Sequence, residues 1–204
     1  MKTCEYAGEP LSEPRSHPWT DAALASDARY YDFTRSPALI RSSLEDFAPF
    51  RSYPAIEDFY ALLERINHPQ SWLESNDCAF NGPGPNQSAQ VPSAVECSGR
   101  LMLLYRALEL NRLKAHVAWL RRALHEELAQ LDPRFVTGVV GTTLIPVRYL
   151  ALPLEAQLGE QLMVSFWSFG DSDASAMQSL ARIFKNLSRA LRSVSSRRVE
   201  LTAR

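Results

Sequence analysis

The sequence predicts an α+β protein: a helical N-terminal half and a long central helix, packed with a C-terminal helix on a small antiparallel sheet of about three strands. Three observations favour this class. Apolar residues recur at helical spacing over much of residues 20–131, a Val- and Thr-rich stretch follows at about 135–169, and helical spacing returns at about 173–194. Hydrophobic residues make up 46% of the 204 residues, which is enough to bury a sizeable core.

The expected organisation is a single domain over residues 20–204, preceded by an acidic, proline-rich arm over residues 1–19. Pro10, Pro14 and Pro18 lie in this arm among acids and serines. Such a composition favours a tail or a strap that lies on the surface.

Three helices are expected in the N-terminal half. A Thr-Asp pair can cap a short helix at about 20–30, and a serine followed by proline at the first helical position favours a second one at 36–48. The third helix begins at Pro54, has acids in its first turn and stops before Pro69. Its apolar residues fall at helical spacing: Ile56, Phe59, Tyr60, Leu63 and Ile66.

Residues 72–98 follow neither a helical nor a strand period, and we interpret them as one long loop. Its first part, residues 72–86, reads WLESNDCAFNGPGPN. Loops of this length are uncommon in compact domains and are usually functional or disordered. Two aromatic residues and a cysteine argue against disorder. The segment is therefore the candidate contact surface.

A long helix is predicted over about 99–131, which ends before Pro133. Either it is broken near Asn111 or it forms the spine of the fold. Its apolar stripe is continuous: Leu103, Leu110, Leu113, Val117, Leu120, Leu124, Leu128 and Leu131.

Strands are expected at about 135–145, 147–152 and 161–169, and their short connections imply an antiparallel sheet. The last strand is apolar on both faces and is placed centrally. The final helix, about 173–194, pairs an apolar stripe with a basic face formed by Arg182, Lys185, Arg189 and Arg192.

Charge is distributed unevenly along the chain. Residues 1–98 hold 7 basic and 14 acidic residues, whereas residues 99–204 hold 15 basic and 9 acidic ones. Because the total is only −1, we favour an acidic half that folds against a basic half over a nucleic-acid or membrane face.

Three cysteines without close pairing favour a reducing compartment, and no apolar run is long enough for a signal peptide or a membrane span. A cytoplasmic location is therefore expected.

The sequence offers one weak catalytic constellation. Cys78 is a candidate nucleophile, assisted by Asp77 and by His68 or His116. A nucleophilic cysteine needs a depressed pKa, and the neighbouring acid has the opposite effect.

No metal or cofactor site is expected. The Cys and His spacings contain no close pair of the kind that zinc sites use. The Gly-Pro-Gly-Pro run also lacks the backbone donors of a phosphate-binding loop, since proline has no N–H.

The function expected from these features is a protein-interaction module with a regulatory, adaptor or partner-neutralising role. Its partner would be another protein, and its oligomeric state is left open. One alternative is an enzyme with Cys78 as nucleophile, and another is nucleic-acid binding through the basic face of the last helix. The predicted contact residues are Trp72, Asn76, Asp77, Phe80, Asn81 and Asn86.

Overall fold

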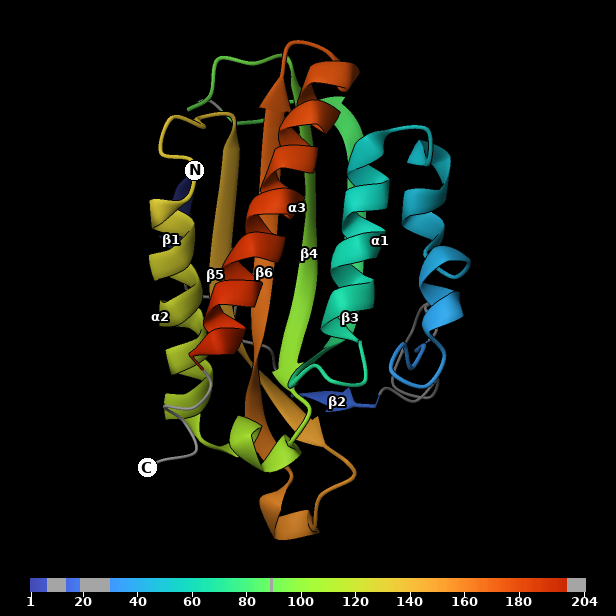
Figure 1. Ribbon diagram of the computed structural model, residues 1–204, viewed down its shortest axis with the longest axis vertical. Helices are drawn as coiled ribbons and strands as arrows, with labels where there is room; N and C mark the ends of the chain where they lie inside the picture. Colours follow the sequence, from blue (N-terminus) through green and yellow to red (C-terminus); the bar gives the residue numbers. More distant parts are fainter. Residues whose placement is uncertain (7–13, 19–29, 89, 198–204) are drawn as a thin grey trace.

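A computed structural model describes residues 1–6, 14–18, 30–88 and 90–197. A six-stranded mixed sheet is covered on one face by helices α1, α2 and α3 (Figure 1). The elements, in chain order, are β1 (Lys2–Glu5), β2 (Arg15–His17), η2 (Pro37–Arg41), η3 (Glu45–Phe50), α1 (Pro54–Ile66), β3 (Leu73–Pro85), β4 (Val95–Tyr105), η4 (Leu108–Arg112), α2 (Lys114–Gln130), β5 (Gly138–Tyr149), η5 (Leu154–Ala156), β6 (Leu158–Gly170) and α3 (Asp173–Ser196).

The class is α+β, but the predicted sheet of about three antiparallel strands is wrong. Two hairpins, β3–β4 and β5–β6, join antiparallel in the order β5-β6-β4-β3, and β1 and β2 each pair with β5 in parallel. Residues 2–5 and 15–17 of the predicted arm are thus strands of the sheet. Residues 7–13, and the helix expected at about 20–30 except for its last residue, lie outside the described residues.

The long loop predicted for residues 72–98 is in fact largely the β3–β4 hairpin. β3 escapes recognition because it is an edge strand, paired only with β4 in the described sheet. Proline, which lacks a donor, is tolerated at such an edge, and two register shifts interrupt the alternation of β3. The backbone of Gly82 packs directly against Phe50, and a Cβ atom at this position would lie 2.0 Å from the Phe50 ring.

The helix predicted for residues 99–131 is wrong in its first half. Residues 99–105 complete β4, and the helix α2 begins only at Lys114. β4 is buried on both faces: Leu101 and Leu103 belong to the main core, and Leu104 to a second cluster with Val147 and Tyr149. A strand covered on both sides reads as a continuous apolar run, which periodicity cannot distinguish from a buried helix.

Two of the predicted helices are confirmed. α1 begins with Pro54 at its first position, as expected. α3 is capped by Ser172, whose hydroxyl accepts from the backbone N–H of Ser175 while the Ser175 side chain bonds back, a reciprocal capping box. Residues 36–48 differ, because they form two short 3-10 helices in place of one α-helix.

The C-terminal strands are found with changed boundaries. Residues 138–149 form one strand in place of two, and β6 occupies the predicted central position between β5 and β4. Its residues Leu162, Val164 and Phe166 face the helices and are fully buried.

The main core lies between the sheet and the helices and is rich in aromatic rings. Phe59 of α1 stacks on Phe47 with ring centroids 4.4 Å apart and lies 4.8 Å from Phe184 of α3. Phe166 of β6 meets Phe184 edge-on at 5.0 Å. These contacts join both helices to the centre of the sheet.

Ion pairs connect the acidic and basic halves of the chain. Arg100 lies 3.0 Å from Asp77, and Lys185 of α3 lies 3.5 Å from Asp58 of α1. Part of the charge asymmetry is therefore neutralised inside the fold. In the part of the chain that the structure describes, no helix combines the length and apolar character that a membrane crossing needs.

Candidate functional site

The two aromatic residues predicted as contact anchors are core residues. Trp72 is 8% exposed, and its indole N–H donates to Ser195 Oγ of α3 at 2.9 Å. Phe80 is 5% exposed and stacks on Phe47 with a centroid distance of 5.0 Å. Neither ring is presented to solvent. They attach β3 to the helices.

Asn76 belongs to a buried polar chain on the sheet face opposite the helices. Its Oδ1 lies 2.6 Å from His17 Nδ1, and its Nδ2 donates to Gln161 Oε1 at 2.8 Å. The other nitrogen of His17 lies 3.2 Å from the Glu74 carboxylate. These bonds fasten β2 to β3 and β6.

The neighbouring polar residues are also engaged within the fold. The Asp77 carboxylate accepts from Arg15 at 3.0 Å and from Arg100. Asn81 is exposed and donates to Ser98 Oγ at 3.2 Å. The Asn86 amide group donates to the carbonyls of residues 91 and 93, so it closes the β3–β4 connection.

The proposed catalytic residues do not converge. Asp77 is opposite Met102 and Cys78 is opposite Leu101, so the two side chains point to different faces of the sheet. Burial, with a further contribution from nearby carboxylates, raises the pKa of the half-buried Cys78 thiol far above its ordinary value.

The two candidate histidines lie elsewhere in the fold. His68 follows α1 and His116 lies in the first turn of α2. Among the described residues, no hydrogen bond or ion pair joins either to Cys78, and no group of three possible metal ligands occurs there.

The basic face of α3 is partly neutralised. Arg182 forms an ion pair with Asp132 and lies 4.6 Å from the centre of the Phe135 ring. Lys185 is paired with Asp58, as described above. Within the described chain, Arg189 and Arg192 have no carboxylate partner.

Sequence reasoning missed an exposed apolar surface at the end of the β5–β6 hairpin. Its four leucines, which we call the leucine tip, are exposed by 40–80%: Leu113, Leu150, Leu154 and Leu158. The hairpin end forms the lower tip of the molecule in Figure 1, beside the junction of η4 and α2. An ion pair of 3.4 Å between Lys114 and Glu160 holds the junction against the hairpin.

The leucine tip has a defined backbone. The N–H of Tyr149 donates to the Gln157 carbonyl at 2.8 Å, and the Gln157 side chain donates to the carbonyl of residue 152 at 3.2 Å. The Tyr149 hydroxyl donates to the Glu160 carbonyl at 2.8 Å. The apolar side chains are thus held outward on a closed turn.

A signal for this surface exists in the sequence. Residues 150–158 read LALPLEAQL, with a single charge where a connection between strands is expected. Of the four leucines in this stretch, three belong to the leucine tip, and Leu152 packs against the second core cluster. Turns are usually polar, so an apolar turn indicates an exposed contact surface.

Comparison with protein-family models, curated proteins and solved structures found no match. What the protein does is therefore inferred from its own residues.

Proposed function

We propose that this protein is a protein-interaction module whose partner protein binds the leucine tip. The observation that carries the proposal is the exposure of four leucines at one end of the molecule. Three lie on the closed hairpin end and Leu113 lies at the adjoining junction of η4 and α2, and Leu154 is the most exposed at 80%. Exposed apolar residues that are scattered singly are normal, whereas apolar residues gathered in one large patch mark interaction sites. The Lys114–Glu160 ion pair of 3.4 Å brings Leu113 beside the hairpin that carries the other three leucines.

The rigidity of the hairpin supports the same function. Because its backbone is closed by hydrogen bonds of 2.8 to 3.2 Å, a partner would not have to order it on binding. Burying a leucine side chain completely contributes about 1.5–3 kcal/mol. Four partly exposed leucines therefore offer an upper limit of roughly 4–7 kcal/mol.

The test places a photo-activatable cross-linking residue, p-benzoylphenylalanine, at position 154 of the full chain in the source cells. The matched control places it at position 35, whose side chain is 88% exposed and which belongs to none of the elements that form the leucine tip. We expect a discrete cross-linked protein from position 154 only. An adduct of twice the chain's mass would identify a second copy as the partner protein.

The same cross-link must depend on the apolar side chains around it. Leu150→Glu with Leu158→Glu should abolish the adduct while changing the free energy of unfolding by no more than about 0.5 kcal/mol per site, because both positions are exposed. An adduct that survives both substitutions, or identical adducts from positions 154 and 35, would contradict the proposal.

A further inference from the structure

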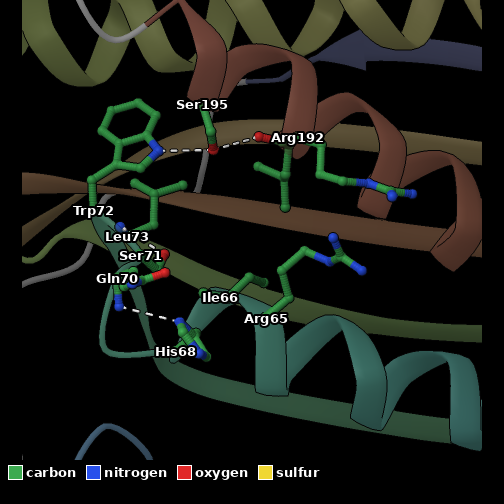
Figure 2. A pocket seen from close by; sticks show the side chains of 10 residues that line it. Arg65, Ile66, His68, Gln70, Ser71, Trp72, Leu73, Arg192 and Ser195 are labelled. Atoms are coloured by element: carbon green, nitrogen blue, oxygen red, sulfur yellow. Dashed lines mark hydrogen bonds between the residues drawn. The ribbon is translucent and has the colours of Figure 1, made fainter.

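A cavity of about 320 Å³ opens between the C-terminal ends of α1 and α3 and the start of β3 (Figure 2). Its apolar lining comes from Ile66, Trp72, Leu73 and Leu191, which are all largely buried. The volume lies in the range of sites for small organic molecules. It is formed by elements other than those of the leucine tip.

The charged side chains at this cavity all have the same sign. Arg65 of α1 and Arg192 of α3 extend their guanidinium groups to the same side (Figure 2). No acidic residue lines the cavity, and within the described residues neither arginine has a carboxylate partner. The hydrogen bond found for Arg192 is a 3.3 Å contact to the carbonyl of residue 188 in its own helix. Two unneutralised guanidinium groups favour an anion.

His68 also lines the cavity, beside Gln70. Its Nδ1 accepts a hydrogen bond from the backbone N–H of Gln70 at 3.2 Å, which is drawn in Figure 2. Because Nδ1 must use its lone pair to accept, the proton of the neutral ring lies on Nε2. Among the described residues, no hydrogen-bond partner is found for that N–H.

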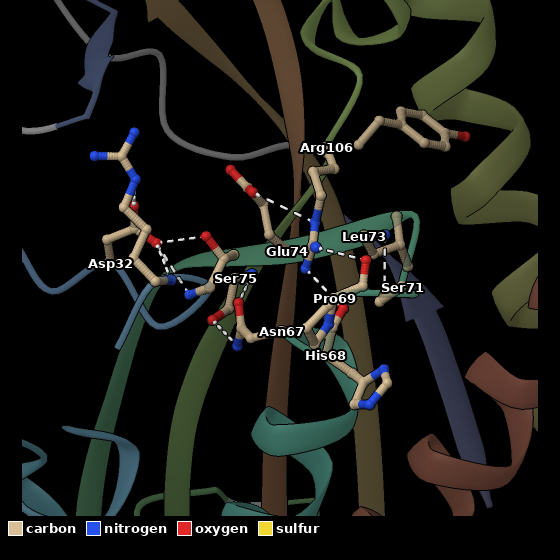
Figure 3. A network of polar contacts seen from close by, with 12 residues as sticks. Asp32, Asn67, His68, Pro69, Ser71, Leu73, Glu74, Ser75 and Arg106 are labelled. Carbon is tan, nitrogen blue, oxygen red and sulfur yellow. Dashed lines mark hydrogen bonds and ion pairs between the residues drawn. The ribbon is translucent and has the colours of Figure 1, made fainter. Parts of the chain in front are cut away.

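The turn that holds His68 is fixed before any ligand arrives. Arg106 donates to the carbonyls of His68 and Pro69 at 2.9 and 3.2 Å and lies 3.9 Å from Glu74 (Figure 3). The Asn67 amide group bonds in turn to the neighbouring strand. On the opposite wall, the bond between Trp72 and α3 keeps the indole ring in place. A site held in this way loses little entropy when it binds.

We propose that this cavity binds a small amphipathic anion: a carboxylate or phosphate group held by Arg65 and Arg192, on an apolar body that packs over Ile66 and Leu191. The charged group and the apolar body of the ligand each match a part of the cavity lining. The guanidinium groups select the negative charge, and the apolar wall favours carbon over water. Charge interactions are also stronger beside an apolar wall than in open water.

Calorimetric titration of the full chain with four probes tests this assignment. Octanoate and octyl phosphate carry both parts, octanol carries only the apolar body, and inorganic phosphate carries only the charge. We expect at least one of the two amphipathic anions to bind, and both single-feature probes to bind at least about tenfold more weakly. Preference between octanoate and octyl phosphate distinguishes an acyl carboxylate from a phosphate ester as the natural ligand.

Variants assign the binding to these side chains. R65Q combined with R192Q should lower the affinity at least about tenfold, whereas R189Q, an exposed arginine of α3 that does not line the cavity, should leave it unchanged. R65E with R192E should reverse the preference from octanoate to octylammonium.

Three results would overturn the proposal. They are octanol binding as tightly as the better of the two amphipathic anions, unchanged affinity for that anion in R65Q with R192Q, and no binding of either amphipathic anion up to about 1 mM. Since L154E should not alter this binding, failure here leaves the function proposed for the leucine tip unaffected, and the reverse also holds.

Discussion

Truncation of Phe80 to alanine should destabilise the fold by about 3–5 kcal/mol. Transfer of a buried phenylalanine side chain out of water contributes about 1.5–3 kcal/mol, and Phe80 is only 5% exposed. Its ring also meets Phe47 at 5.0 Å and Phe50 at 5.5 Å, and such pairs add about 0.5–1.5 kcal/mol each. The total, about 2.5–6 kcal/mol, brackets the range of about 3–5 kcal/mol typical of Phe→Ala changes in cores.

Urea denaturation followed by circular dichroism measures this loss of free energy directly. Thermal denaturation of the same variant should show a melting temperature lower by roughly 6–20 °C for a chain of this size. The matched control is Asn81→Ala, since this neighbour is exposed and should cost less than about 0.5 kcal/mol. Phe80→Leu retains most of the apolar volume and should cost less than half as much as Phe80→Ala. If Phe80→Ala and Asn81→Ala cost the same small amount, β3 is not packed against the helices and the loop interpretation returns.

Three further outcomes follow from the structure. At pH 7.4, Cys78 should react with iodoacetamide at least about tenfold more slowly than the exposed Cys4, because its thiol pKa is strongly raised; equal rates, measured by peptide mass spectrometry, would contradict this. Burial raises the pKa of Cys97 from 9.0 to about 11. Because the unfolded chain loses the thiol proton at a lower pH than the folded one, the free energy of unfolding is highest below pH 9 and falls as the pH rises to 11. Cys97→Ala should remove this contribution and make the plot of unfolding free energy against pH shallower in that interval by up to about 1.4 kcal/mol per pH unit. Arg106→Gln should accelerate hydrogen exchange in residues 68–72, since the carbonyls of that turn lose a charged donor, at a cost of about 1–3 kcal/mol; unchanged exchange would show that the turn does not depend on it.

The elements that could be predicted are those whose signals are local. α1 has a proline at its first position, acids in its first turn and a complete apolar stripe, and it forms where expected. α3 adds a capping box that lies wholly within four consecutive residues. Helical hydrogen bonds close within a few residues, so composition and spacing are sufficient to locate such elements.

The candidate site was predicted less well, because the type of a residue does not reveal whether its side chain is buried or exposed. Trp72 and Phe80 have the composition of binding anchors, yet their surroundings make them core residues. Trp72 nevertheless lines the cavity of Figure 2 together with Arg192, a member of the predicted basic face. What sequence reasoning lacked was Arg65, which only the packing of α1 beside α3 brings to the same opening.

By itself, then, the sequence determined the α+β class, the two amphipathic helices, the central position of β6 and the absence of close metal-ligand spacing. Tertiary structure alone decided that residues 73–85 and 95–105 form a hairpin, because strand pairing joins residues far apart in the chain and leaves no local period at a bulged edge. It also decided which apolar side chains remain exposed. Leu101 and Leu103 of β4 are buried, whereas Leu154 and Leu158 at the leucine tip are exposed. The exposure of a leucine depends on which elements pack over it and not on its type.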